Sequence, residues 1–192
     1  PALHIALNNT FPDAVNQALM AFLRDRLSAW PLIFSTSESP ENLAKLARDE
    51  ADIGVIIGDR LPAGLYAVNL PGLNIEVVAA SAGMPVNNDT VLIKPMPECA
   101  YSDCFERFVS RYKNGYGKLP VHYSGSEHIS VAMINSSNSI GIISRRVALM
   151  NNLTILPEFT DALSVTLLMK TPLLSERDLA AFTPDPSLPL SA

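Results

Sequence analysis

The stretch Leu3-His4-Ile5-Ala6-Leu7-Asn8-Asn9-Thr10 decides the fold, because it is a short apolar run that ends abruptly in small polar residues. Apolar residues then recur at helical spacing over Phe11–Phe22, so a strand passes directly into a helix. Pro31–Phe34 is a second strand, and Ser39-Pro40 after it reads as N-cap and first helical residue. Ile53–Ile57 closes the unit. Alternating strands and helices with short loops predict a parallel sheet.

The rest of the chain repeats this alternation with more interruptions. We expect strands at 65–70, 75–80, 91–93, 121–123, 140–143, 153–156 and 163–169, and helices that begin near Ser102, after Ser126, at Arg145 and at Ser175. The order predicts two α/β units, of which the second is inserted into the first. We therefore predict an α/β fold of two Rossmann-like lobes, with a ligand cleft between them. Lobe I comprises residues 1–58 and 155–192, and lobe II comprises residues 59–154.

Composition excludes several classes of protein. The 192 residues are 48% hydrophobic and 17% charged, which is ordinary for a globular protein. A net charge of −5 argues against this chain itself gripping a nucleic-acid backbone, which needs clustered Lys and Arg. No apolar run approaches the ~20 residues of a membrane span. Two cysteines, five positions apart, are too few for a disulfide scaffold, so we expect a cytoplasmic protein without membrane contact.

Three strand ends are polar and each begins a helix, namely Asn8-Asn9-Thr10, Ser35-Thr36-Ser37 and Ser124-Gly125-Ser126. Open parallel sheets bind ligands at the carboxyl ends of their strands, and free N–H groups at helix N-termini favour anions. The alternative is that each Ser or Thr only caps its own helix. Three such ends in a two-lobed layout favour a binding cleft.

The sequence offers little support for catalysis. His4 lies inside a strand, and His122 and His128 lack the spacing of metal ligands. Neither a Gly-rich phosphate loop nor a nucleophile elbow is present. Ser126 and His128 point to different faces of a helix and cannot act as a nucleophile pair. We therefore expect no enzyme activity, no metal and no cofactor.

The ordered set of motifs resembles the effector-binding domain of LysR-type transcriptional regulators along essentially the whole chain. The motifs are Leu3–Ala6, Phe22-Leu23 before Trp30-Pro31, Leu43-x-x-Leu46 leading to Ala51–Val55, and Ser139–Arg145. Pro97-x-Cys99 and Tyr123-Ser124 resemble the LrhA/HexA-like branch of motility and virulence repressors. Two positions depart from the family pattern: Asp49 replaces a usual glycine, and Ser144 replaces a proline.

The resemblance implies a fold similar to type II periplasmic binding proteins and a small-molecule effector between the lobes. It also implies a homodimer or tetramer, and a winged helix-turn-helix that would precede Pro1 and carry all contact with DNA. Asp59 and Arg60 would lie at the hinge. The effector-binding positions that it implies are Asn8, Asn9, Thr10, Phe11, Thr36, Ser37, Arg60, Pro97, Cys99, Tyr101, Tyr123, Ser124 and Ser126.

Neighbouring residues suggest the chemistry of the effector. The apolar residues Phe11, Met96 and Tyr123 lie beside these positions in the sequence, and Arg60 could reach an anion. A solvated hinge charge is the alternative interpretation of Arg60. We therefore expect an organic anion or a partly apolar metabolite with a polar head.

Both cysteines lie in the stretch Lys94–Phe108, where they raise a second possibility. Peroxide-sensing members of the same family carry a reactive cysteine much where Cys99 lies, so a redox-sensing domain is one alternative. The acids Glu98 and Asp103 oppose a thiolate there, and we expect Cys104 to pack inside the helix. A stand-alone solute-binding protein of the same fold is a further alternative.

Overall fold

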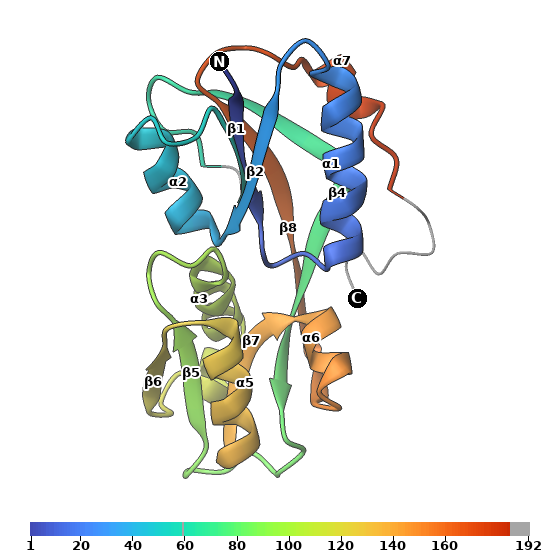
Figure 1. Cartoon of the computed structure of the whole chain (residues 1–192). Coiled ribbons are helices and arrows are strands. Elements are labelled where there is room, and N and C mark those ends of the chain that lie inside the picture. The colour runs from blue at the N-terminus through green and yellow to red at the C-terminus, as the bar shows by residue number, and fades with distance from the viewer. Residues whose placement is uncertain (59, 185–192) are drawn as a thin grey trace. The chain divides into compact units, whose positions relative to one another are not determined.

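The computed structural model describes residues 1–58 and 60–184. The described residues form two compact units (Figure 1): unit 1 consists of residues 1–74 and 164–184, and unit 2 consists of residues 75–163. The division falls inside two long strands, β4 (Tyr66–Ser81) and β8 (Thr154–Met169). The boundaries expected from the sequence, 58/59 and 154/155, fall before β4 and at the start of β8, whereas the division in the structure lies further along both strands.

Unit 1 contains the alternation that opens the sequence. Its elements are β1 (Leu3–Asn8), α1 (Asp13–Arg26), β2 (Leu32–Ser37), α2 (Ser39–Ala47), β3 (Ile53–Ile57), parts of β4 and β8, and α7 (Glu176–Ala180). The strand order is β2-β1-β3-β8, followed by β4. β1 runs parallel to β2 and β3, which confirms the predicted parallel sheet, and β8 joins β3 in the antiparallel direction. Figure 1 shows α2 on one face of this sheet and α1 with α7 on the other.

The continuity of β4 and β8 corrects the sequence prediction of two short strands in each place. Pro71 and Pro157 lie inside these strands with exposed rings, where a missing N–H is tolerated. The Pro71-Gly72 pair looks like a turn, yet Gly72 serves a close contact instead. A Cβ at Gly72 would lie 3.0 Å from both the Phe182 carbonyl oxygen and the Pro184 ring. The Pro71-Gly72 pair therefore marks a close backbone contact inside β4, and not the turn that the sequence suggested.

Asp49 stands in the turn after α2, where a glycine is usual, and it keeps the conformation of that turn. Its φ is 58°, in the left-handed region where glycine is favoured and Asp or Asn is the usual substitute. Its carboxylate also pairs with Lys170, at the end of β8 in the same unit. The turn that leads into β3 is therefore kept by a residue that tolerates the backbone and gains an ion pair.

Unit 2 repeats the parallel strand pattern with different connections. Its elements are the second half of β4, then β5 (Val91–Pro95), α3 (Tyr101–Arg111), α4 (Lys113–Tyr116), β6 (Val121–Ser124), α5 (Glu127–Ser136), β7 (Ser139–Ser144), α6 (Arg145–Met150) and the first part of β8. The strand order is β4-β7-β5-β6. β5 is parallel to β6 and β7, whereas β4 pairs with β7 in the antiparallel direction.

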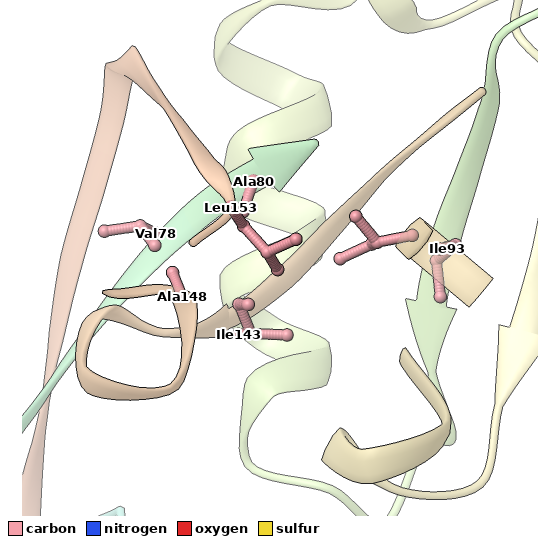
Figure 2. Packing of buried hydrophobic residues seen from close by; sticks show 7 residues of the cluster. Val78, Ala80, Ile93, Ile143, Ala148 and Leu153 are labelled. Atoms are coloured by element: carbon pink, nitrogen blue, oxygen red, sulfur yellow. The ribbon is translucent and has the colours of Figure 1, made fainter. Parts of the chain in front are cut away.

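The apolar core of unit 2 lies between its sheet and the helices α5 and α6. Figure 2 labels six of its residues, which come from β4, β5, β7, α6 and the position just before β8: Val78, Ala80, Ile93, Ile143, Ala148 and Leu153. Ile134 of α5 completes the cluster. Gly141 of β7 sits directly beneath α5. A Cβ there would lie 2.9 Å from Ile134 Cδ1, and Ile134 itself is fully buried. The helix thus packs against bare backbone.

We predict that Gly141→Val destabilises unit 2, because the new side chain must displace a buried isoleucine from a packed core. The expected loss is about 1–3 kcal/mol in the free energy of unfolding, measured by urea denaturation. Gly125→Val is the matched control, since no atom lies within 4 Å of a Cβ at that position. Equal stability of the two variants would contradict the packing described here.

Candidate functional site

Asn8 is the centre of the polar strand ends in unit 1, and its side chain is fully buried. Its Nδ2 donates to Ser39 Oγ at 3.0 Å and to the Val55 carbonyl at 3.1 Å. Its Oδ1 accepts from the Thr10 backbone N–H at 3.0 Å. One amide therefore joins the end of β1 to α2, to β3 and to the following turn.

Ser39 belongs to this network and is not the N-cap predicted from the sequence. Helix α2 is preceded by Glu38, which makes no side-chain cap, and Ser39 is the first helical residue. Its hydroxyl oxygen accepts from the Ile57 backbone N–H at 3.0 Å as well as from Asn8. The Ser39 hydroxyl thus bonds to groups of β1 and β3 and not to its own helix. Both strands are distant from Ser39 in the sequence, so the local pattern could not predict these contacts.

Two further buried amides, Asn16 and Asn42, went unrecognised in the sequence. Asn16 Nδ2 donates to the Asn8 carbonyl at 2.9 Å, and Asn42 Nδ2 donates to the Leu7 carbonyl at 2.9 Å and the Val55 carbonyl at 3.0 Å. Each leaves a buried Oδ1 without a hydrogen-bond partner among the described residues. Asparagine inside an apolar helical stripe is the signal that could have found them.

Lys45 brings a cation to the end of β2. Its Nζ donates to Ser37 Oγ at 2.9 Å and lies 3.4 Å from Ser35 Oγ. Both serines precede α2, whereas Lys45 lies in the last turn of that helix. Because a lysine in a helix is normally solvent-exposed, the sequence did not predict the contact between Lys45 and the two serines. An ammonium group with two hydroxyls can hold a carboxylate or phosphate.

The other positions implied in unit 1 differ in exposure. Asn9 and Thr36 are exposed, and Thr10 and Ser37 are half-buried. Phe11 is 3% exposed and belongs to the core, so it is packed rather than open to a ligand. Arg60 is exposed, while its neighbour Asp59 lies outside the described residues.

The polar strand end of unit 2 is a chain of serines. Ser126 caps α5, accepting from the Ile129 backbone N–H at 3.1 Å, which confirms the predicted cap. Ser124, at the end of β6, donates to the Ser126 carbonyl at 2.7 Å and accepts from Ser130 Oγ at 2.8 Å. Ser124 is 2% exposed, so its hydroxyl is part of the framework.

Glu127, the first residue of α5, is the acidic group that sequence reasoning missed. Its Oε2 accepts from the Ser144 backbone N–H at 2.8 Å, at the end of β7. Burial raises the pKa of Glu127, and the Ser144 N–H opposes that rise. Tyr101 is 5% exposed, and its hydroxyl lies near Glu127 and Ser144 without a hydrogen bond of normal geometry. Burial likewise raises the pKa of Tyr101 well above its ordinary value.

The remaining positions implied in unit 2 are more accessible. Pro97 is exposed, Tyr123 is 60% exposed, and Cys99 is half-buried. Cys99 lies in the turn after β5, where its backbone N–H donates to the Met96 carbonyl. Its carbonyl accepts from the Ser102 N–H at 3.0 Å. This turn leads directly into α3.

Cys104 is buried inside α3, as the sequence predicted. Burial raises the pKa of its thiol to about 12, and the neighbouring Asp161 adds to the effect. Arg107 partly offsets it, since its guanidinium lies 3.4 Å from the sulfur and also pairs with Asp161. The thiol is therefore protonated at neutral pH. It is a poor nucleophile and a poor partner for a disulfide.

Two kinds of feature do not occur among residues 1–58 and 60–184. No three His, Cys, Asp or Glu side chains gather there in an arrangement that could hold a metal ion. No helix in the same part of the chain is long and apolar enough to cross a membrane.

The fold matches solved regulatory domains. It is similar to the effector-binding domain of QuiR in complex with shikimate, with a TM-score of 0.66 at 12% identity over 95% of this chain and 94% of that one. The OxyR2 E204G regulatory domain from Vibrio vulnificus gives 0.65 at 15% identity over 94% and 92%. The Synechocystis CcmR regulatory domain in complex with 2-PG gives 0.64 at 14% identity over 93% and 92%.

These likenesses establish the fold, which is the mixed α/β, type II periplasmic-binding-protein-like fold of LysR-type regulatory domains. The predicted fold class is therefore confirmed. No family model and no curated protein matches the sequence.

We predict that Asn8→Ala destabilises unit 1 by about 2 kcal/mol or more, because it leaves the Thr10 N–H and the Ser39 hydroxyl without their buried partner. Chemical denaturation measures the loss. Asn9→Ala is the control, since Asn9 is exposed and should change the free energy of unfolding by less than about 0.5 kcal/mol. A fully stable Asn8→Ala chain would show that the amide is not a structural link.

The two thiols should differ in reactivity. At about pH 8 a thiol with a pKa near 12 is almost entirely protonated, so Cys104 should resist a disulfide reagent while the chain is folded. We expect one thiol to react in the native chain, two in urea, and none quickly in native Cys99→Ser. Fast reaction of two native thiols would contradict the burial of Cys104.

Proposed function

We propose that this chain is the effector-sensing domain of a LysR-type transcription regulator, and that it acts without catalysing a reaction. The observation that carries the proposal is the set of polar strand ends, each at the carboxyl end of a parallel strand, on a fold shared with regulatory domains. Open sheets use this edge to bind ligands. The titles of two matched structures name a small molecule, shikimate for QuiR and 2-PG for CcmR.

The effector in this proposal is a small organic acid. In unit 1 we assign its anionic group to Lys45 and Ser37, with the exposed Asn9 and Thr36 beside them. Asn8 and Phe11 hold these residues in place but do not contact the ligand, because both are buried and Asn8 is fully hydrogen-bonded. In unit 2 the accessible candidate positions are Tyr123 and Cys99. Arg60, which is exposed in unit 1 before β4, is a further candidate for the anionic group.

Further parts of the proposal extend beyond this chain. A winged helix-turn-helix elsewhere in the protein would bind DNA, and effector binding would alter that module through a homodimer or tetramer. The net charge of −5 agrees with a domain that does not bind DNA directly. We also propose a cytoplasmic location and, from Pro97-x-Cys99 and Tyr123-Ser124, a place in the LrhA/HexA-like branch.

A redox role is the second candidate, because Cys99 is a half-buried thiol in the turn before α3. The candidate is weakened by Cys104, whose buried and protonated thiol is a poor resolving partner. Thermal-shift screening of small carboxylates separates the two functions. Stabilisation by a carboxylate supports effector sensing. A chain that ignores carboxylates but loses a thiol to peroxide supports redox sensing instead.

We predict that Lys45→Met weakens the binding of any carboxylate found in that screen by about ten-fold, which corresponds to about 1.4 kcal/mol. The variant keeps the apolar stem of the side chain and loses only the ammonium group that contacts Ser37. Calorimetric titration measures the affinity. Lys118→Met removes the same charge from an exposed position of unit 2 and should bind normally. Equal affinities for both variants would contradict the assignment of the anionic group.

A further inference from the structure

Gly72 lies in β4, where its missing side chain makes room for another part of unit 1. Its φ lies outside the left-handed region that favours glycine, so the backbone at this position would accept other residues. An added Cβ would lie 3.0 Å from the Phe182 carbonyl oxygen and 3.0 Å from Pro184 Cδ. Glycine at this position is therefore explained by the close approach of the segment Phe182–Pro184, which is distant in the sequence.

Phe182 fastens this segment to α1. Its side chain is only 4% exposed, and its ring meets the ring of Phe22 edge-on, with 5.2 Å between the centroids and 63° between the planes. Aromatic pairs in this arrangement stabilise a fold beyond the apolar area that they bury. The backbone N–H of Phe182 also donates to the Leu179 carbonyl at 3.1 Å, so the segment continues directly from the last turn of α7.

Helix α7, which precedes the segment, is itself attached to α1. Its first turn forms a capping box, and Leu179 is fully buried. The carboxylate of Asp178 lies 3.5 Å from the guanidinium of Arg26, which also lies over the Phe22 ring. Because a solvent-accessible ion pair stabilises little, the buried side chains of Leu179 and Phe182 provide most of this attachment.

The part of β4 that this segment contacts lies at an edge of the sheet. β7 pairs with β4 at Val77–Ser81, and those residues belong to unit 2. Within the described residues, no strand is paired with the same edge of Tyr66–Asn74 in unit 1, and the strand order places β8 on the other side. Edge strands present unpaired backbone groups and open locally more easily than central strands.

We infer that Phe182–Pro184 is a strap that holds the unit 1 part of β4 in the sheet, and that its release loosens this strand while the rest of unit 1 stays folded. β4 continues into unit 2 after Asn74. The strap therefore sets the local stability of a strand on which both units are built. It needs no effector, so it is independent of the proposed function.

Gly72→Val tests the strap, because valine suits a strand but its side chain occupies the space of Phe182 and Pro184. Hydrogen exchange of the whole chain under native conditions, measured by mass spectrometry, should become at least about ten-fold faster in peptides that cover residues 66–74. Peptides that cover β1 should exchange as they do in the unaltered chain. Phe182→Ala removes the anchor of the strap and should give the same local increase. Gly72→Ala, which adds the Cβ alone, replaces the valine variant if that variant fails to fold.

Gly125→Val is the matched control, since no atom lies within 4 Å of a Cβ at that position, and it should leave the exchange of residues 66–74 unchanged. The double variant Gly72→Val/Phe182→Ala should exchange at most about two-fold faster there than either single variant, because both changes release the same strap. The inference is overturned if the two effects multiply, if β1 and residues 66–74 accelerate equally, or if the folded variants exchange no faster than the unaltered chain. A failed carboxylate screen would contradict the proposed function and leave these exchange rates readable.

Discussion

The buried amide of Asn8 is the contact on which the polar edge of unit 1 depends. A parallel strand that turns into a helix exposes backbone groups that neither element can pair by itself. Asn8 supplies donors to Ser39 and Val55 and an acceptor to Thr10, so three segments meet on one side chain. Because unpaired buried groups are costly, loss of this amide would leave buried polar groups of all three segments without a partner.

The two units satisfy the polar groups at their strand ends with different kinds of side chain. Unit 1 uses amides, since Asn16 and Asn42 also donate from buried positions to carbonyls of the Leu7-Asn8 strand end. Unit 2 uses hydroxyls and an acid: Ser124 links β6 to α5, and Glu127 links α5 to β7. The similarity between the units therefore lies in their topology, and the side chains that complete it are specific to each unit.

Much of the fold could be predicted because local patterns encode it. The alternation of strands and helices, the parallel pairing in unit 1 and the cap at Ser126 follow from apolar spacing and from residues adjacent in sequence. The continuity of β4 and β8 could not be predicted in this way. Pro71 and Pro157 break a strand in one environment and are tolerated in another, and the difference is whether the ring faces solvent.

The candidate site was harder to predict than the fold, for a related reason. Lys45 and Glu127 lie at opposite ends of ordinary helices, where a charge normally indicates a solvent-facing position. Their contacts with Ser37 and Ser144 arise because another strand ends beside each helix. The converse error concerns Asn8 and Ser124, whose positions at strand ends suggested ligand contact. The structure places both inside the framework, at 0% and 2% exposure.

These charged residues carry more information about the ligand than the fold does. The same fold is found at 12% to 15% identity in the three structures compared above, so few of its residues can be common to all. Ligand choice must then depend on the side chains that each chain places at its strand ends. Here unit 1 places an ammonium group beside two hydroxyls, and unit 2 places a carboxylate beside a phenol.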